Sequence, residues 1–255
     1  MTGRVAIVTG GTTGIGLATA RALIDSGHRV AIGARSAADP ALVAEVCEQL
    51  GAEVFLERLD VASRASCDGF VARVAATLGA PTVLVNAAGI YREAFLADHS
   101  EEDWTDQIEI NLTGAFRMTR AVYPAMVAAG WGRIANIAST AGTKGAAGYA
   151  GYCASKAGLI GLSKATAVEG APHGISCIAV SPTWVETPMM TNAFHRIAAA
   201  GEISLSDARA RIETSNPQGR IVQPDEVAAL IDFFCSDRAP GFTNVDVQIN
   251  AGADW

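Results

Sequence analysis

Short runs of Val, Ile and Ala recur along the chain, separated by longer stretches whose apolar residues follow a helical spacing. The short runs lack the polar alternation of a half-exposed strand, and strands covered on both faces have this composition. We therefore expect buried strands at residues 4–9, 29–34, 53–58, 82–85, 133–138, 175–181 and 245–250.

The stretches between these strands carry apolar stripes typical of helices that pack on a sheet. One stripe is formed by Phe70, Val71, Val74, Ala75 and Leu78, and another by Val227, Leu230, Ile231 and Phe234. Right-handed crossovers between such strands predict an α/β fold, a doubly wound parallel sheet of seven strands with helices on both faces. Ligands bind such sheets at the carboxyl ends of the strands, so the functional residues are expected in the loops there.

No repeat or linker divides the chain, so residues 1–255 are predicted to form one domain. Residues 186–216 differ from the rest because they contain no strand pattern but hold two Met, a Phe, a His and several Ala. We expect this segment to be a helical, substrate-binding lid.

The amino-acid composition limits the kinds of partner that this protein is expected to bind. A net charge of −7 without a Lys/Arg cluster disfavours nucleic acid or an anionic membrane, and no apolar run is long enough to span a bilayer. The first strand begins too early for a leader segment, which predicts a cytoplasmic protein. The five cysteines are dispersed without metal-ligand spacing, so we expect reduced thiols and no metal.

A glycine-rich turn, Thr9-Gly10-Gly11-Thr12-Thr13-Gly14-Ile15-Gly16, follows the first strand and opens a helix. Glycines let the backbone approach a diphosphate closely, and the N–H groups of the helix start attract its charge. No Lys follows the last glycine, which disfavours a P-loop. The turn therefore predicts dinucleotide contacts at Gly10, Thr12, Thr13, Gly14, Ile15 and Gly16.

The end of the second strand bears on cofactor choice. An acidic residue there would bind the adenosine ribose of NAD, but this chain has Ala34, followed by Arg35 and Ser36. A small residue leaves room for a 2′-phosphate and a guanidinium can pair with it, which favours NADP(H). NAD(H) stays possible, because Arg35 could instead be a solvated surface residue.

Four polar residues form a candidate catalytic group. Tyr152 and Lys156 are four apart on one face of a predicted helix over 152–171, and Ser139 follows the fifth strand. Asn111 lies inside a predicted helix over 103–129, although Asn is a mediocre helix former. Tyr149 is a competing tyrosine, but the residue four positions later is Cys153, which offers no cation, so Tyr149 fits a pocket wall better.

Together these motifs resemble the short-chain dehydrogenase/reductase family over essentially the whole chain. The turn at 9–16 and the segment Asn86-Ala87-Ala88-Gly89 match family motifs, whereas Thr183 replaces the usual glycine after Pro182. The resemblance implies a Rossmann fold and a catalytic tetrad of Asn111, Ser139, Tyr152 and Lys156. It also implies cofactor contacts at Asp60, Val61, Asn86, Ala87, Gly89, Tyr152, Lys156, Pro182, Val185 and Thr187.

The implied reaction moves a hydride between a nicotinamide and a ketone or secondary alcohol. Tyr152 would be the proton donor, with its pKa lowered by Lys156 and the oxidised cofactor, and Ser139 would be the second donor to the substrate oxygen. Lys156 would also bind the nicotinamide ribose, and Asn111 would hold a water.

Residues 137–142 and 185–189 resemble ketoreductases of the 3-oxoacyl and polyketide kind. No basic group stands near Ser139 to anchor a small free acid, so we expect a neutral apolar, cyclic or 3-oxoacyl-type ketone against Ser139, Tyr149, Trp184 and Met189.

Other readings remain open: an NAD-dependent secondary alcohol dehydrogenase working in the oxidative direction, or a non-catalytic cofactor-binding regulator. The short C-terminal part disfavours an epimerase or dehydratase. The family resemblance further implies a homotetramer, with the helices over 103–129 and 152–171 pairing across a two-fold axis and Trp255 as a second contact.

Overall fold

The computed structural model describes residues 3–51 and 54–253 of the chain. Its centre is a parallel sheet of seven strands in the order β3-β2-β1-β4-β5-β6-β7. The strands are β1 Val5–Thr9, β2 Arg29–Ala34, β3 Phe55–Arg58, β4 Pro81–Asn86, β5 Gly132–Ile137, β6 Ile175–Pro182 and β7 Val245–Ile249. This is the predicted doubly wound sheet, with each predicted strand recovered to within two residues at its described ends. Residue 53 of the third predicted strand lies outside the described residues.

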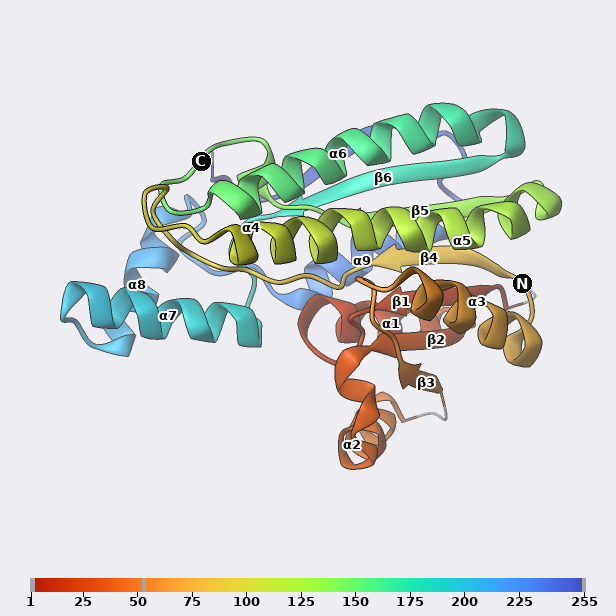
Figure 1. Ribbon diagram of the computed structural model, residues 1–255, viewed down its shortest axis with the longest axis horizontal. Helices are drawn as coiled ribbons and strands as arrows, with labels where there is room; N and C mark the ends of the chain where they lie inside the picture. The colour runs from red at the N-terminus through yellow and green to blue at the C-terminus, as the bar shows by residue number, and fades with distance from the viewer. Residues whose placement is uncertain (1–2, 52–53, 254–255) are drawn as a thin grey trace.

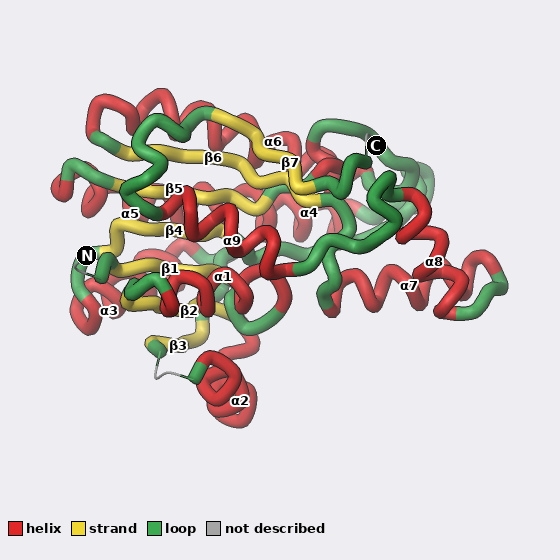
Figure 2. Tube along the Cα trace, turned by 180° about the vertical axis from the view of Figure 1, so that it is seen from behind, coloured by secondary structure: helices red, strands yellow, loops and turns green. Residues whose placement is uncertain are grey.

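Helices cover both faces of the sheet. They are α1 Gly14–Asp25, α2 Pro40–Leu50, α3 Arg64–Leu78, α4 Glu101–Ile108, α5 Gly114–Ala129, α6 Ala150–Gly170, α7 Pro188–Gly201, α8 Leu205–Ser215 and α9 Pro224–Cys235. Helices α3, α4, α5 and α6 lie on the face toward the viewer in Figure 1, and α1 and α9 on the opposite face in Figure 2. One apolar core fills each interface, the first beneath α1 and α9 and the second beneath α3 and α5. The strands β1, β2, β4, β5 and β6 are therefore buried on both faces, as their composition predicts. The prediction of buried strands is wrong for β3 and β7, which are partly exposed because each lies at an edge of the sheet.

The strand order of the sheet indicates where a ligand should bind. The chain runs outward from β1 to β3, then crosses to β4 and continues outward to β7, so the direction reverses between β1 and β4. Helices α7 and α8, which make up the predicted segment 186–216, project beyond the sheet at one end of the molecule (Figure 1). In a doubly wound sheet a ligand is expected at this reversal, outside the carboxyl ends of the strands.

The predicted single helix over 103–129 is interrupted. It consists of α4 and α5 joined by a wider π-helical turn, Glu109–Thr113, in which Asn111 lies. A π-helical turn inserts one extra residue per turn and often accompanies a functional site. The helical pattern of the sequence was correct, but periodicity over so many residues does not detect one widened turn.

All five cysteines are free thiols. Burial raises the pKa of Cys177 and of Cys235 to about 12, so these two act as small apolar core residues rather than as nucleophiles.

Candidate active site

A cavity of about 530 Å³ lies at the carboxyl ends of the strands. Its walls come from the loops that follow β1, β2, β3, β4, β5 and β6, together with the start of α6 and of α7. The volume falls within the range of small-molecule and cofactor sites, and the position is the one that the fold predicts.

The glycine-rich turn after β1 is shaped by close backbone contacts. Gly10 has φ +68°, and a Cβ built there would lie 2.8 Å from the Cα of Ala88. A Cβ on Gly16 would lie 2.4 Å from the carbonyl oxygen of Gly10. The Thr9 hydroxyl accepts hydrogen bonds from the backbone N–H groups of Ala87 (3.2 Å) and Ala88 (3.1 Å), which join the turn to the loop after β4. Packing therefore requires glycine at both positions, and at Gly10 the backbone conformation requires it as well.

The start of α1 fits a diphosphate. Thr13 occupies the N-cap but its side chain accepts no capping hydrogen bond, and the first turn holds no acidic residue. By contrast, Ser63, Ser100 and Ser204 cap their helices. The N–H groups at the start of α1 border the cavity without a side-chain acceptor, which leaves them available to an anionic ligand.

The adenosine side of the cavity carries positive charge. Ala34 is buried and Arg35 is exposed, and both line the cavity beside Ser36. The Ser36 and Thr12 hydroxyls share a hydrogen bond of 3.1 Å. None of the described residues that line the cavity bears a carboxylate. A phosphate bound here would thus meet one cation and two hydroxyl groups, whereas a ribose diol would find no acidic acceptor.

Tyr152, Lys156 and Ser139 meet at the other side of the cavity. The first two project from α6, and Ser139 follows β5 with its hydroxyl accepting from the N–H of Ala141 at 3.1 Å. Lys156 is 5% exposed and its Nζ donates to the carbonyl oxygen of Ile137 at 2.7 Å. The same Nζ lies 5.5 Å from the centroid of the Tyr152 ring. The spacing of four residues in the sequence thus brings the phenol and the ammonium together.

Burial shifts the pKa of both Tyr152 and Lys156. Burial raises the pKa of its phenol to about 12, and a hydrogen bond with Ser139 opposes that rise. Burial lowers the pKa of Lys156 to about 8. The predicted lowering of the Tyr152 pKa by Lys156 and the oxidised cofactor together stays a prediction for the protein with its cofactor bound. In the protein without cofactor, burial has the largest effect on the pKa of Tyr152, and the Lys156 ammonium donates to the Ile137 carbonyl.

Asn111 forms hydrogen bonds with the loop after β4 and with α6. Its carboxamide pairs with the backbone of Ile90, accepting from the N–H at 2.8 Å and donating to the carbonyl at 2.9 Å, and it also donates to the Ser155 hydroxyl at 3.0 Å. Ser155 in turn donates to the carbonyl of Tyr152 at 2.8 Å. The side chain therefore ties the π-helical turn to α6 and to the loop after β4. Asn111 does not line the cavity, and its contact with a water stays a prediction.

Two residues predicted to contact the cofactor do not line the cavity. The Asp60 carboxylate accepts from the N–H of Ala62 at 3.1 Å and so stabilises its own turn. Asn86 is buried in the sheet, where its amide donates to the side-chain oxygen of Asn136 at 2.8 Å. A match to a motif places the backbone of a segment, but the direction of each side chain depends on its neighbours.

The other predicted cofactor and substrate residues line the cavity. They are Gly10, Thr12, Thr13, Gly14, Ile15, Gly16, Arg35, Ser36, Val61, Ala87, Gly89, Ser139, Tyr149, Tyr152, Lys156, Pro182, Trp184, Val185, Thr187 and Met189. Sequence reasoning missed Ile90, Ile110 and the segment 144–146, which also line it. The one available signal for 144–146 was its position between the fifth strand and the predicted helix of Tyr152.

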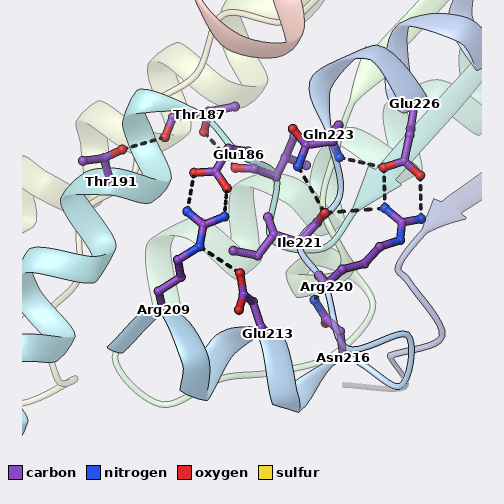
Figure 3. A network of polar contacts seen from close by, with 11 residues as sticks. Glu186, Thr187, Thr191, Arg209, Glu213, Asn216, Arg220, Ile221, Gln223 and Glu226 are labelled. Atoms are coloured by element: carbon purple, nitrogen blue, oxygen red, sulfur yellow. Dashed lines mark hydrogen bonds and ion pairs between the residues drawn. The ribbon is translucent and has the colours of Figure 1, made fainter. Parts of the chain in front are cut away.

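The predicted lid segment, residues 186–216, is held together by an ion-pair network between its own parts (Figure 3). Arg209 of α8 holds both carboxylate oxygens of Glu186, at 3.1 and 2.5 Å, and also donates to Glu213 at 2.8 Å. Glu186 is followed by Thr187, which caps α7 and whose methyl group packs beside Gly14 of the glycine-rich turn. The network thus connects α8 to the part of the wall nearest the start of α1.

The sheet, the glycine-rich turn and the cavity define a nucleotide-binding α/β protein of the Rossmann type. A model of the family described as short chain dehydrogenase matches residues 4–198. The chain belongs to this family, and it is an NAD(P)-dependent oxidoreductase acting on CH–OH groups, a ketoreductase.

Individual relatives match nearly the whole chain. One from Streptomyces virginiae, named as a ketoacyl reductase of the monensin polyketide synthase, is 42% identical and covers 98% of this chain and 97% of its own. The FabG 3-oxoacyl-(acyl-carrier-protein) reductase of Salmonella typhimurium is 38% identical, covering 98% and 97%. A solved structure of an actinorhodin polyketide ketoreductase variant with NADPH has a TM-score of 0.94 at 38% identity and covers 99% and 98%.

Proposed function

We propose that this protein reduces a neutral, apolar ketone of the cyclic or 3-oxoacyl type to a secondary alcohol, with NADPH as the preferred reductant. The observation that carries the proposal is the grouping of Tyr152, Ser139 and Lys156 in a cavity whose described lining residues include no carboxylate. The names of the relatives, which are ketoacyl and 3-oxoacyl reductases, support the same substrate class.

The residues present fit the cofactor. The turn from Gly10 to Gly16 and the start of α1 would hold the diphosphate, and Arg35 with Ser36 and Thr12 would hold the 2′-phosphate. Val61, Ala87 and Gly89 would contact the adenosine side, and Pro182, Val185 and Thr187 would lie against the nicotinamide. When bound, NADPH supplies the hydride that reduces the carbonyl carbon.

The chain itself supplies the proton and stabilises the developing charge. As negative charge builds on the carbonyl oxygen, the Ser139 hydroxyl donates a hydrogen bond to it and the Tyr152 phenol donates the proton. Lys156 stabilises the phenolate that Tyr152 becomes and binds the ribose hydroxyls. Asn111 acts through Ser155, because its hydrogen bonds fix the helix that carries Tyr152.

The substrate half of the cavity favours an apolar ketone. Tyr149, Trp184 and Met189 line it, and the lid over residues 186–216 would close over the bound substrate. Lys144 also lines the cavity, contrary to the expectation that no basic group stands near Ser139, so the proposal of a neutral ketone rests on the apolar side chains.

The test is a panel of ketones and alcohols assayed with both cofactors, followed by the absorbance of the reduced nicotinamide. We expect NADPH oxidation with cyclic and 3-oxoacyl ketones. Faster oxidation of secondary alcohols with NAD⁺ would favour the alcohol dehydrogenase, and tight NADPH binding with no turnover of any panel member would favour the cofactor-binding regulator.

We also propose a homotetramer formed through α4, α5 and α6. These helices expose Trp104, Phe116 and Val168, at 43%, 46% and 66%, and apolar side chains of this size are normally covered in a stable assembly. Trp255, the other predicted contact, lies outside the described residues. A monomer mass from light scattering would overturn the proposal.

None of the helices in residues 3–51 and 54–253 combines the length and apolarity needed to cross a bilayer. We propose a cytoplasmic location on a separate ground, since free cysteines are typical of reducing compartments. Cell fractionation tests it.

A further inference from the structure

One arginine of the predicted lid contacts a tyrosine of the active-site wall. Arg196 of α7 places its guanidinium carbon 4.5 Å from the centroid of the Tyr91 ring, and its Nε lies 3.4 Å from the carboxylate of Glu93. The Tyr91 hydroxyl donates to the same carboxylate at 2.7 Å. Tyr91 and Glu93 belong to the loop after β4, so one arginine of the lid binds both the ring and the acid that fixes it.

Tyr91 also borders the proposed proton donor. Its ring packs against that of Tyr152 in a T-shaped arrangement, with centroids 5.3 Å apart, and against that of Tyr149 at 5.1 Å. Tyr91 lines the cavity. Aromatic rings at these separations attract one another with a definite geometry, so the position of Tyr91 constrains the space beside the Tyr152 phenol.

The tyrosine hydroxyls of this wall form hydrogen bonds with other residues of the wall. The hydroxyls of Tyr91 and Tyr149 share a hydrogen bond, and Tyr91 donates to Glu93. Burial, reinforced by these contacts, raises the pKa of Tyr91 well above that of a free tyrosine, so its ring is neutral. The wall therefore presents aromatic carbon surface, rather than hydrogen-bonding groups, to a bound substrate.

We propose that Arg196 is a positioning residue that acts through Tyr91 and selects ring-bearing ketones. With α7 in place over the cavity, its guanidinium holds Tyr91 against Tyr152 and completes the aromatic wall. Without this cation the Tyr91 ring loses the contact from the lid and can turn away, which removes the surface that a flat substrate would pack on. The inference rests on the proposed ketone reduction and specifies the substrate class of that site.

The experiment compares a bicyclic ketone, tetralone, with an unbranched methyl ketone of similar carbon count. Arg196→Met removes the cation and keeps much of the volume, and we expect kcat/KM for tetralone to fall about tenfold while the value for the methyl ketone changes less than about threefold. Arg196→Lys restores the charge but not the planar stacking group and should recover part of the loss. Arg211→Met, at an exposed arginine of α8, is the matched control and should leave both values unchanged.

A double-mutant cycle tests whether Arg196 acts through Tyr91. Tyr91→Leu should produce the same selective loss as Arg196→Met, and the double variant should lose little more, because both substitutions remove one wall. Tyr91→Phe keeps the ring but removes the hydroxyl that Glu93 holds, so it should retain more of the kcat/KM for tetralone than Tyr91→Leu does. The melting temperature and the dissociation constant for NADPH, measured for each variant, should stay close to the parent values.

Two results would overturn the proposal in distinguishable ways. Equal losses for both ketones in Arg196→Met, or fully additive losses in the double variant, with the parent protein active, would reduce Arg196 to a structural contact and leave the proposed function intact. Failure of the parent protein to oxidise NADPH with either ketone would overturn both.

Discussion

The buried ammonium of Lys156 should make ketone reduction pH-dependent in a range where Tyr152 does not titrate. Burial lowers the pKa of Lys156 to about 8 and raises that of Tyr152 to about 12. Between pH 7 and pH 9 the phenol therefore keeps its proton, while the lysine loses its charge. The proton leaves Tyr152 more readily when a cation lies beside the phenolate, so only the form with charged Lys156 reduces efficiently.

The size of the effect follows from the protonated fraction. A base with a pKa of about 8 is charged in about nine tenths of the molecules at pH 7 and in about one tenth at pH 9. If the rate follows that fraction, kcat/KM for ketone reduction falls about tenfold between these two values. The direction is a loss as the pH rises through the pKa, since the protonated lysine is the active form.

Initial rates of NADPH oxidation at saturating cofactor would measure this profile. Lys156→Met should give a low and nearly flat profile, because it has no charge to lose. Lys164→Met is the matched control, since Lys164 lies exposed on the same helix, and it should keep the parent profile. A parent kcat/KM that changes less than about twofold between pH 7 and 9 would refute the reasoning, because the charge on Lys156 would then not matter to the proton transfer.

Three further predictions follow from the same geometry. Tyr152→Phe should lower kcat about 100-fold or more and leave the dissociation constant for NADPH nearly unchanged, because only the proton is lost; turnover within a few-fold of the parent would contradict the assignment. Ala34→Asp with Arg35→Ile should move the preference from NADPH toward NADH, since a charge-assisted phosphate contact contributes about 1.5–3 kcal/mol. The ratio of kcat/KM for the two cofactors measures the preference, and a parent protein that prefers NADH would contradict the prediction. Arg209→Met should lower the melting temperature by about 1–4 °C, because a half-exposed ion pair of this kind contributes about 0.5–1 kcal/mol, and a double-mutant cycle with Glu186→Gln should show that coupling. Additive melting shifts would mean that the two side chains do not stabilise each other.

The elements and much of the cavity could be predicted because they depend on short stretches of chain. A buried strand is recognised from a few consecutive apolar residues, and the turn from Gly10 to Gly16 from its glycines between a strand and a helix. The four-residue spacing of Tyr152 and Lys156 predicted that both lie on one face of a helix, and in the structure both line the cavity. The absence of an acid at Ala34 was likewise visible directly in the sequence.

What the sequence left undecided depends on contacts between distant segments. The pKa of Tyr152 is set by burial, and burial is supplied by every element packed around it. The Asn111 carboxamide could have faced a water, and only the approach of Ile90 and Ser155 assigns its hydrogen bonds.

Two further features could be identified only in the folded structure. Asp60 was placed by a motif match, and its carboxylate turned out to stabilise its own turn. The pairing of Arg196 with Tyr91 joins residues about a hundred positions apart, and no local pattern connects a lid helix to a loop after the fourth strand. Local composition and spacing thus determined the fold, the glycine-rich turn and the pairing of Tyr152 with Lys156 on one helical face. Side-chain direction, protonation and the contacts of α7 were decided by tertiary packing, because each depends on which surfaces the fold brings together.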